Sequence, residues 1–295
     1  MTLARVQQER KGAQTIHDIV NATRAIAAGR IHDAQQALAG ARRYQAVVMH
    51  AAEIALTDLG AAQSRLDGHR TVLLVVTAEQ PLCGSLNQNV LTLAERRLEE
   101  LDREGHVDLL VIGTRGLRQL AAHNIVPAGG EPAATSLSGV RDVVMRVASD
   151  LNARYSAGNV STVRVVYSRY VSVSEQVPTE EVILPPDLSA LRLAASSRPH
   201  HYYHYLPTPV LLEGILAEYA FITLYRIAAE AYTCEQAARL VAMDAATRNT
   251  EHLLDDLRDL EQRERQGQIT RQVLELIGAR FAARTSAGAT FASTH

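Results

Sequence analysis

Proline is missing from both ends of this 295-residue chain. None occurs from Thr2 to Ala62 or from Val210 to His295. A proline inside a helix removes a backbone hydrogen bond and clashes with the preceding turn, so its absence leaves both ends free to form uninterrupted helices. Since a helix rises about 1.5 Å per residue, each end has the length for a helix of roughly 90–120 Å. The sequence therefore predicts two long helices that flank a compact central segment.

Residues for cofactor, metal or disulfide chemistry are scarce. The chain has neither a glycine-rich dinucleotide fingerprint nor a phosphate-binding loop, which argues against nucleotide binding. Cys83 and Cys234 are isolated and lack the spacing of a metal site or a disulfide framework. There is no signal peptide and no apolar run long enough to cross a bilayer. We therefore expect no cofactor, no metal, no catalytic residue and no direct membrane insertion.

A strong charge of either sign is also lacking. The formal net charge is −2, which argues against general nucleic-acid binding. Lys11 is the only lysine, so arginine carries nearly all of the positive charge. Arginine forms fork-like pairs with carboxylates and is enriched at protein interfaces, so this composition favours protein partners.

The N-terminal segment carries a heptad pattern. Between residues 3 and 59, thirteen of seventeen positions spaced alternately three and four apart are apolar, as in a seam between packed helices. The C-terminal segment is apolar at its start, charged from Leu253 to Gly267, and apolar again up to Ile277. We predict that the two terminal helices pack antiparallel. The seam positions are Leu3, Val6, Arg10, Ala13, His17, Val20, Arg24, Ala27, Ile31, Ala34, Leu38, Ala41, Gln45, Val48, Ala52, Ala55 and Leu59.

The central segment alternates between strand and helix patterns. Thr71–Thr77 and Val107–Ile112 are continuous apolar runs, typical of strands buried on both faces. This order predicts right-handed crossovers and a parallel, Rossmann-like sheet. The other expected elements are helices at Leu86–Arg103, Leu117–His123 and Val140–Tyr155, a strand at Val160–Tyr167, a loop at Gly129–Pro132, and an edge pair at Val171–Val177 and Glu181–Leu184.

Four local features have both a functional and a structural interpretation. Gly113–Gly116 fits an anion-binding nest or, more simply, an ordinary strand-to-helix turn. Glu79, in the turn after the first strand, would repel a phosphate. Cys83 fits a small buried thiol better than a nucleophile, since no histidine lies nearby in the sequence. A histidine cluster fits a metal site or, better, a solvated hinge between sheet and helix; it consists of His200, His201 and His204.

One C-terminal stretch resembles a family signature. Cys234–Asn249 reads C-E-Q-A-A-R-L-V-A-M-D-A-A-T-R-N, which closely resembles the S-E-Q-A-A-R-M-V-A-M-x-x-A-T-x-N of the gamma subunit of F-type ATP synthases. Three weaker matches lie in the family's order, at Ala27–Arg30, Pro81–Gly84 and Arg263–Ile277. The resemblance extends over nearly the whole chain, from Leu3 to Gly278.

The resemblance implies a rotor shaft on an α/β foot. The fold class would be α/β plus a long antiparallel α-helical coiled coil formed by the N- and C-terminal helices. Residues 1–65 and 207–285 would form the shaft, residues 68–206 the Rossmann-like foot, and residues 286–295 a flexible tail. The chain would carry no catalytic group. As a central stalk it would couple ion flow through the membrane sector to ATP synthesis or hydrolysis at the beta subunits.

The resemblance also implies partners and contact residues. The partners would be the alpha and beta subunits of the catalytic ring, the epsilon subunit and the membrane c-ring. The location would be peripheral, at the cytoplasmic face of the bacterial inner membrane. The expected polar contacts with partners are Arg24, Arg30, Arg239, Arg265, Gln266 and Thr270. The apolar residues expected to be exposed at the helix tips, where they would face a ring lining, are Leu3, Val6, Ile269, Val273 and Ile277.

The chain departs from the family pattern at several positions. The usual D-R-G-L-C-G is E-Q-P-L-C-G at Glu79–Gly84, and the lysine that often follows A-M is Asp244. These changes suggest a divergent branch, such as the sodium-linked bacterial type, and leave the coupling ion and the direction of flux open. Two other classes stay open as well. An enzyme with a degenerate nucleotide-binding fold predicts a polar pocket near Gly84 and Gly113, and a coiled-coil adaptor predicts a stable homodimer.

Overall fold

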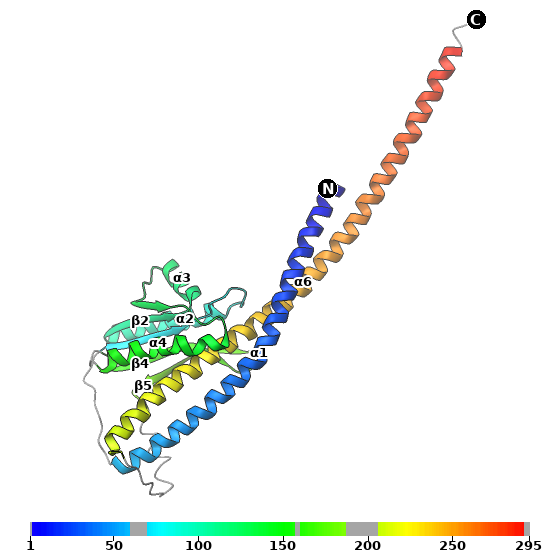
Figure 1. Cartoon of the computed structure of the whole chain (residues 1–295). Coiled ribbons are helices and arrows are strands. Elements are labelled where there is room, and N and C mark those ends of the chain that lie inside the picture. The colour runs from blue at the N-terminus through cyan, green and yellow to red at the C-terminus, as the bar shows by residue number, and fades with distance from the viewer. Residues whose placement is uncertain (1, 60–69, 157–159, 187–205, 292–295) are drawn as a thin grey trace. The chain divides into compact units, whose positions relative to one another are not determined.

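A computed structural model of the chain describes residues 2–59, 70–156, 160–186 and 206–291 (Figure 1). It contains two compact units: a terminal unit of residues 1–23 and 243–295, and a central unit of residues 24–242. The histidine cluster lies outside the described residues. The elements are α1 (Leu3–Leu59), β1 (Arg70–Val76), α2 (Leu86–Glu104), β2 (His106–Ile112), α3 (Thr114–Ala122), β3 (Gly129–Glu131), α4 (Leu137–Ser156), β4 (Thr162–Tyr170), β5 (Gln176–Leu184) and α6 (Thr208–Phe291).

The N-terminal helix buries one heptad series. α1 runs unbroken from Leu3 to Leu59. Every residue that it buries stands at a predicted seam position, and most of them lie in steps of seven residues from Val6 to Ala55, where Val20 alone is half-buried. Alanine dominates the series, and its small side chain permits close approach of a neighbouring backbone. The buried residues are Val6, Ala13, Ala27, Ile31, Ala34, Leu38, Ala41, Val48, Ala52 and Ala55.

The C-terminal helix is longer than the sequence predicts. α6 spans 84 residues, from Thr208 to Phe291, and the described part of the expected flexible tail belongs to it. Burial is concentrated in its first half, whereas residues 271–280 are all exposed. None of the described helices combines the length and the apolarity needed to cross a bilayer.

In the terminal unit, α1 and α6 run in opposite directions. The Nε atom of Arg10 lies 2.8 Å from a carboxylate oxygen of Glu261. The Nδ1 atom of His17 lies 3.0 Å from the hydroxyl of Thr250. The residues of α6 that α1 contacts therefore have decreasing residue numbers as the residue numbers along α1 increase. The apolar cluster of this unit contains Val6, Ala13, Leu254 and Leu257.

The central unit is built on a five-stranded sheet. The strand order is β3-β2-β1-β4-β5. The pairs among β3, β2, β1 and β4 are parallel, and β5 runs antiparallel to β4 at the edge. The parallel core that the apolar runs predicted is therefore present, within a mixed sheet.

Helices cover both faces of this sheet (Figure 1). Because successive side chains of a strand point to opposite faces, neighbouring residues of β1 enter different cores. Leu73 and Val75 pack with α2 and α3. Val72 and Leu74 pack with α4, α6 and Ala34 of α1. The first half of α6 is thus part of the core of the α/β segment.

Two segments differ from the sequence-based expectation. Gly129–Glu131, expected to be a loop, forms β3 beside the end of β2. A side chain at Gly130 would come within 2.7 Å of the Leu117 side chain, so glycine lets this strand lie against α3. The expected edge pair is a single strand, β5, preceded by a hydrogen-bonded turn at Val171–Glu175. The edge position tolerates Pro178, which has no N–H to donate.

Candidate functional site

At the carboxyl end of the parallel strands, the Glu79 carboxylate fills the turn after β2. It accepts hydrogen bonds from the Thr114 backbone N–H at 3.0 Å, the Thr114 hydroxyl at 2.7 Å and the Ala133 backbone N–H at 2.8 Å. In a nucleotide-binding sheet, donors at this edge hold the anionic ligand. Here the Glu79 carboxylate accepts the hydrogen bonds of these donors in place of a ligand. The turn at Gly113–Gly116 is therefore filled by a side chain of the same chain.

The environment of Glu79 keeps it charged. Partial burial opposes the charge, but the hydrogen bonds from Thr114 and Ala133, together with nearby Arg118, outweigh burial and lower the pKa of the Glu79 carboxyl. Packing is also tight beside it, because a Cβ atom at Gly116 would lie 2.4 Å from the Thr77 hydroxyl. The edge is therefore occupied by structural groups.

A second carboxylate, from α6, holds the turn between β1 and α2. Glu235 accepts the backbone N–H groups of Glu79 at 3.0 Å and Gln80 at 3.4 Å. Arg239 lies four residues further along α6 and donates to Glu235 at 2.6 Å and to the Pro81 carbonyl at 3.3 Å. The side chains of Glu235 and Arg239 are each only 5% exposed. These contacts fasten the turn to α6.

The turn itself has an unusual backbone. Leu82 has a φ of 70° and Gly84 a φ of 58°. Bulky residues rarely adopt positive φ, so the contacts with α6 hold Leu82 in a conformation that is costly by itself. Two of the sequence segments that resemble the family, Pro81–Gly84 and Cys234–Asn249, are therefore in direct contact.

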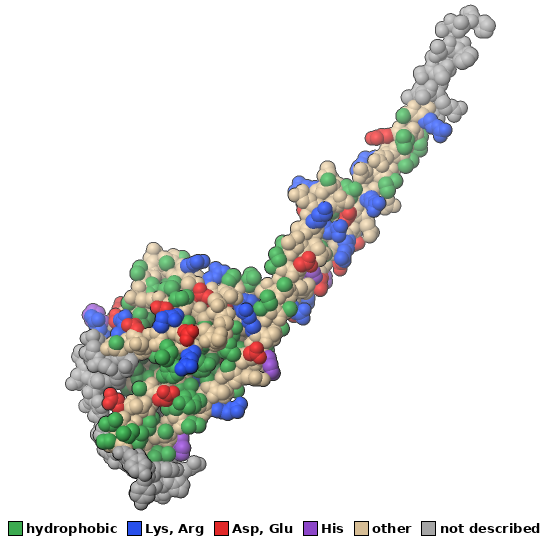
Figure 2. Space-filling model, viewed as in Figure 1, with side chains coloured by type: hydrophobic (Ala, Val, Ile, Leu, Met, Phe, Trp, Pro, Cys, Tyr) green, Lys and Arg blue, Asp and Glu red, His purple; other side chains and the backbone are tan. Residues whose placement is uncertain are grey.

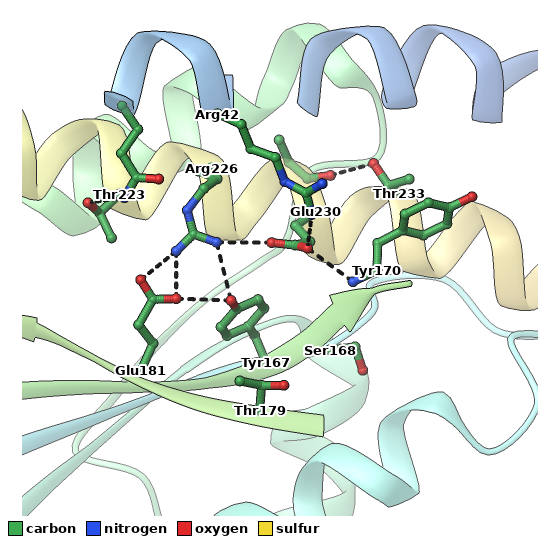
Figure 3. A network of polar contacts seen from close by, with 12 residues as sticks. Arg42, Tyr167, Ser168, Tyr170, Thr179, Glu181, Thr223, Arg226, Glu230 and Thr233 are labelled. Carbon is green, nitrogen blue, oxygen red and sulfur yellow. Dashed lines mark hydrogen bonds and ion pairs between the residues drawn. The ribbon is translucent and has the colours of Figure 1, made fainter. Parts of the chain in front are cut away.

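A third polar cluster joins α1, α6 and the sheet (Figure 3). Arg226 of α6 donates to both carboxylate oxygens of Glu181 at 2.6 Å and to Glu230 at 3.0 Å. It also donates to the Tyr167 hydroxyl at 3.2 Å, and that hydroxyl donates to Glu181 at 3.0 Å. Glu230 accepts Arg42 of α1 at 2.6 Å. Two positive and two negative side chains thus meet in one cluster.

Burial and charge shift the pKa values of this cluster. Burial raises the pKa of Tyr167 to about 12, although the neighbouring Arg226 partly offsets the effect. Burial disfavours the charge of Arg226, but the Glu181 carboxylate and the Tyr167 hydroxyl outweigh it and raise the pKa of Arg226 above its ordinary value. At neutral pH, Tyr167 is therefore a neutral donor and Arg226 a fixed cation.

A hollow of about 220 Å³ lies beside Gly84, where the enzyme hypothesis predicts a polar pocket. Its lining includes Ser85, Asn89 and Gln176 together with apolar residues of α6. Among the described lining residues, Cys83 is the one titratable group, and burial raises the pKa of its thiol. Among the described residues, no group of three or more His, Cys, Asp or Glu side chains is placed to hold a metal. The hollow lacks the acid–base pair that hydrolytic or transfer chemistry needs.

The structure separates the predicted contact residues into two environments. Arg24, Arg265, Gln266 and Thr270 are exposed. Thr270 donates to the Gln266 carbonyl within the helix. Arg30 is half-buried and donates to the Thr135 carbonyl at 3.4 Å, and Arg239 is buried as described above.

Apolar side chains are exposed on the last described part of α6 (Figure 2). Ile269 is 54% exposed and Leu276 is 71% exposed. Val6, which the sequence analysis grouped with such exposed residues, is fully buried against Leu254 and Leu257, so that expectation is wrong. The exposed apolar residues of this segment are Ile269, Val273, Leu274, Leu276 and Ile277.

The third polar cluster had no counterpart in the sequence analysis. Its one local signal is the pair Arg226 and Glu230, which lies four residues apart inside an apolar helical run. Such a pair usually marks a solvated helix face. The apolar residues around it were the sign that this pair is buried.

Comparison with known proteins identifies the family. The ATP synthase family model matches residues 2–282. The ATP synthase gamma chain of Ralstonia nicotianae is 28% identical over 282 residues, covering 91% of this chain and 94% of the relative. That of Leptothrix cholodnii is 31% identical over 215 residues, covering 70% and 71%.

Solved structures show the same fold. A chain of the Euglena gracilis mitochondrial ATP synthase (OSCP/F1/c-ring, rotational state 3) aligns with a TM-score of 0.62 and 15% identity, over 97% of this chain and 95% of that one. A chain of the Tetrahymena thermophila mitochondrial ATP synthase (central stalk/c-ring) aligns with a TM-score of 0.55 and 17% identity, over 77% and 99%.

These matches define a non-catalytic subunit of a rotary ATP synthase. Within that class, the chain belongs to the ATP synthase gamma-chain family. It is a central-stalk subunit, and the catalytic sites of the complex lie in the beta subunits.

Proposed function

We propose that α1 and α6 form an antiparallel coiled-coil shaft, residues 1–65 and 207–285, and that residues 68–206 form a Rossmann-like foot. The observation that carries this proposal is the heptad burial of α1, from Val6 to Ala55. A repeat of seven residues keeps one stripe of a helix against a partner helix over many turns. The contacts of Arg10 with Glu261 and of His17 with Thr250 support the antiparallel direction within the terminal unit.

The shaft turns inside a ring of alpha and beta subunits. The foot faces the epsilon subunit and the membrane c-ring. Ion flow through the membrane sector turns the c-ring and this chain with it, and the asymmetric shaft biases each beta subunit in turn between nucleotide affinities. The chain contributes stiffness and shape rather than chemistry. We place the complex at the cytoplasmic face of the bacterial inner membrane, with this chain peripheral to the bilayer.

The polar joints of the central unit suit this role. Torque must pass from the sheet to α6 without slippage. The pair Glu235 and Arg239 fastens the turn after β1 to α6, and Glu79 fastens the same turn to α3. Charge-assisted hydrogen bonds are short and directional, so they resist sliding better than apolar contacts alone.

Partner contacts fall on the exposed polar residues. Arg265, Gln266 and Thr270 face solvent in the isolated chain, and we assign them to hydrogen bonds with a beta-subunit loop. Arg24 faces the ring on α1, whereas Arg30 is half-buried and donates to the Thr135 carbonyl of the α/β segment. Arg239 acts through the turn that it holds, since its side chain is buried. A desolvated hydrogen bond to a carboxylate contributes roughly 1.5–3 kcal/mol.

The test is a paired substitution in the reconstituted complex. Arg265→Ala with Gln266→Ala should lower ATPase turnover several-fold and leave the helicity of the isolated chain unchanged. The matched control replaces Gln262 and Arg263, which are also exposed and adjacent on α6. Wild-type turnover and coupling in the first variant would show that this pair is not a working contact.

A further inference from the structure

Among the described residues, a side chain from α1 balances the charge of the cluster in Figure 3. Arg226 and Glu230 come from α6 and Glu181 from β5, and these three side chains alone carry a net charge of −1. The Glu230 side chain is 1% exposed, that of Arg226 is 10% exposed and that of Glu181 is 31% exposed, so Glu230 is the buried carboxylate of the group. Arg42 of α1 supplies the compensating charge from a side chain that is 48% exposed.

A buried group with excess charge is strongly unfavourable, so it favours the one arrangement that neutralises it. Glu230 accepts Arg42 at 2.6 Å and also the Tyr170 backbone N–H at 3.1 Å, using the same oxygen. Its other oxygen accepts Arg226. The carboxylate therefore bonds α1, β4 and its own helix at once. Sliding α1 along α6 would withdraw the charge of Arg42 from this point.

We propose that Arg42 is a positioning residue whose ion pair with Glu230 fixes the register of α1 on the α/β segment, so that helix and sheet turn as one body. The alanines specify this register only weakly, because those at 27, 34 and 41 repeat every seven residues. Hydrogen bonds from Gln35 to Tyr170 and from Gln45 to Thr223 also favour the observed register. The ion pair of Arg42 adds a charge penalty to any other register. The inference rests on the proposed function, because register matters most in a part that transmits torque.

The first test uses hydrogen exchange in the full-length chain alone. Arg42→Met should raise the exchange rates of backbone amides in the α1 segment around residue 42 by about tenfold. The effect is smaller than for a fully buried partner, because Arg42 is half-exposed. In the background of Glu230→Gln, where the remaining Arg226 and Glu181 balance each other, Arg42→Met should change the rates little. Arg42→Lys keeps the charge and should stay close to wild type.

The control is the neighbouring arginine. Arg43 is exposed and makes no side-chain hydrogen bond or ion pair with the part of the chain that the structure describes, so Arg43→Met makes the same chemical change without touching the cluster. Equal effects of Arg42→Met and Arg43→Met, or an Arg42→Met effect that persists undiminished with Glu230→Gln, would overturn the proposal.

The second test measures coupling in the assembled complex. With Arg42→Met, ATP hydrolysis should continue while ATP-driven ion transport per ATP falls several-fold, and adding Glu230→Gln should lower this ratio little further, because the ion pair is already lost. A purely structural role would lower both activities together, with the yield of complex, and would count against the proposal. If the wild-type chain itself supports no coupled transport, the proposed function fails, whereas the exchange experiment still decides the role of Arg42.

Discussion

The clearest quantitative prediction concerns Arg239, which sequence resemblance alone assigned to partner contact. In the structure its guanidinium lies 2.6 Å from Glu235, and both side chains are 5% exposed. Replacing Arg239 by methionine keeps much of the volume but leaves the Glu235 carboxylate buried with only two backbone N–H donors. Loss of one partner from a buried ion pair costs about 3–5 kcal/mol.

We therefore expect Arg239→Met to lower the free energy of unfolding of the isolated chain by about 3–5 kcal/mol. Arg265→Met, an exposed substitution of the same type, should change it by no more than ~0.5 kcal/mol. Urea unfolding followed by far-UV circular dichroism measures both. The double variant with Glu235→Gln should recover most of the loss, because no unpaired charge stays buried.

Two outcomes would refute the reasoning on Arg239. One is a loss below about 1 kcal/mol in Arg239→Met, which would mean that Glu235 is readily rehydrated. The other is an equal loss in the single and double variants, which would place the cost in packing rather than in charge.

Three further outcomes follow from the described contacts. The pKa of Glu79 is lower in the folded chain than its ordinary value of 4.5, so the charged carboxylate stabilises the fold above that pH. This contribution is lost as the pH falls through the folded pKa. The melting temperature of Glu79→Gln should therefore decrease less than that of wild type when the pH is lowered across this range. Gly267→Ala should raise the free energy of unfolding by ~0.5–1 kcal/mol, since an added Cβ atom meets nothing within 4 Å. Gly116→Ala should lower the free energy of unfolding, since its Cβ atom would lie 2.4 Å from the Thr77 hydroxyl. Thermal unfolding measures both effects. Cys83 and Cys234 should react with a thiol reagent only on unfolding, because burial raises both thiol pKa values; rapid labelling of the native chain would contradict the burial.

The long-period features of the fold were open to prediction from sequence. The heptad of α1 repeats over its whole length, so a few polar positions such as Arg10 and His17 do not obscure it. The continuous apolar runs of β1 and β2 predict buried strands. In each case the information lies in residues that are neighbours in the chain.

Features that depend on residues far apart in the sequence could not be predicted in this way. Gly129 and Gly130 have low strand propensity, and β3 exists because the end of β2 offers backbone groups to pair with. Arg226 and Glu230 look like a solvated pair until Glu181, 45 positions away from Arg226, is brought beside them. Glu79 was expected to repel a phosphate, and the structure adds that its carboxylate occupies the donors such a ligand would need.

The exposed end of α6 has a consequence for how such a complex is built. Residues 271–280 expose every side chain, including Leu274 and Leu276 at 62% and 71%. A helix without tertiary packing gains little free energy from each added residue, and its free end frays in water. Under the proposed function, the surrounding subunits would close around this tip and supply the apolar surface that it lacks. Ring closure would then complete the folding of this chain as well as the assembly of its neighbours.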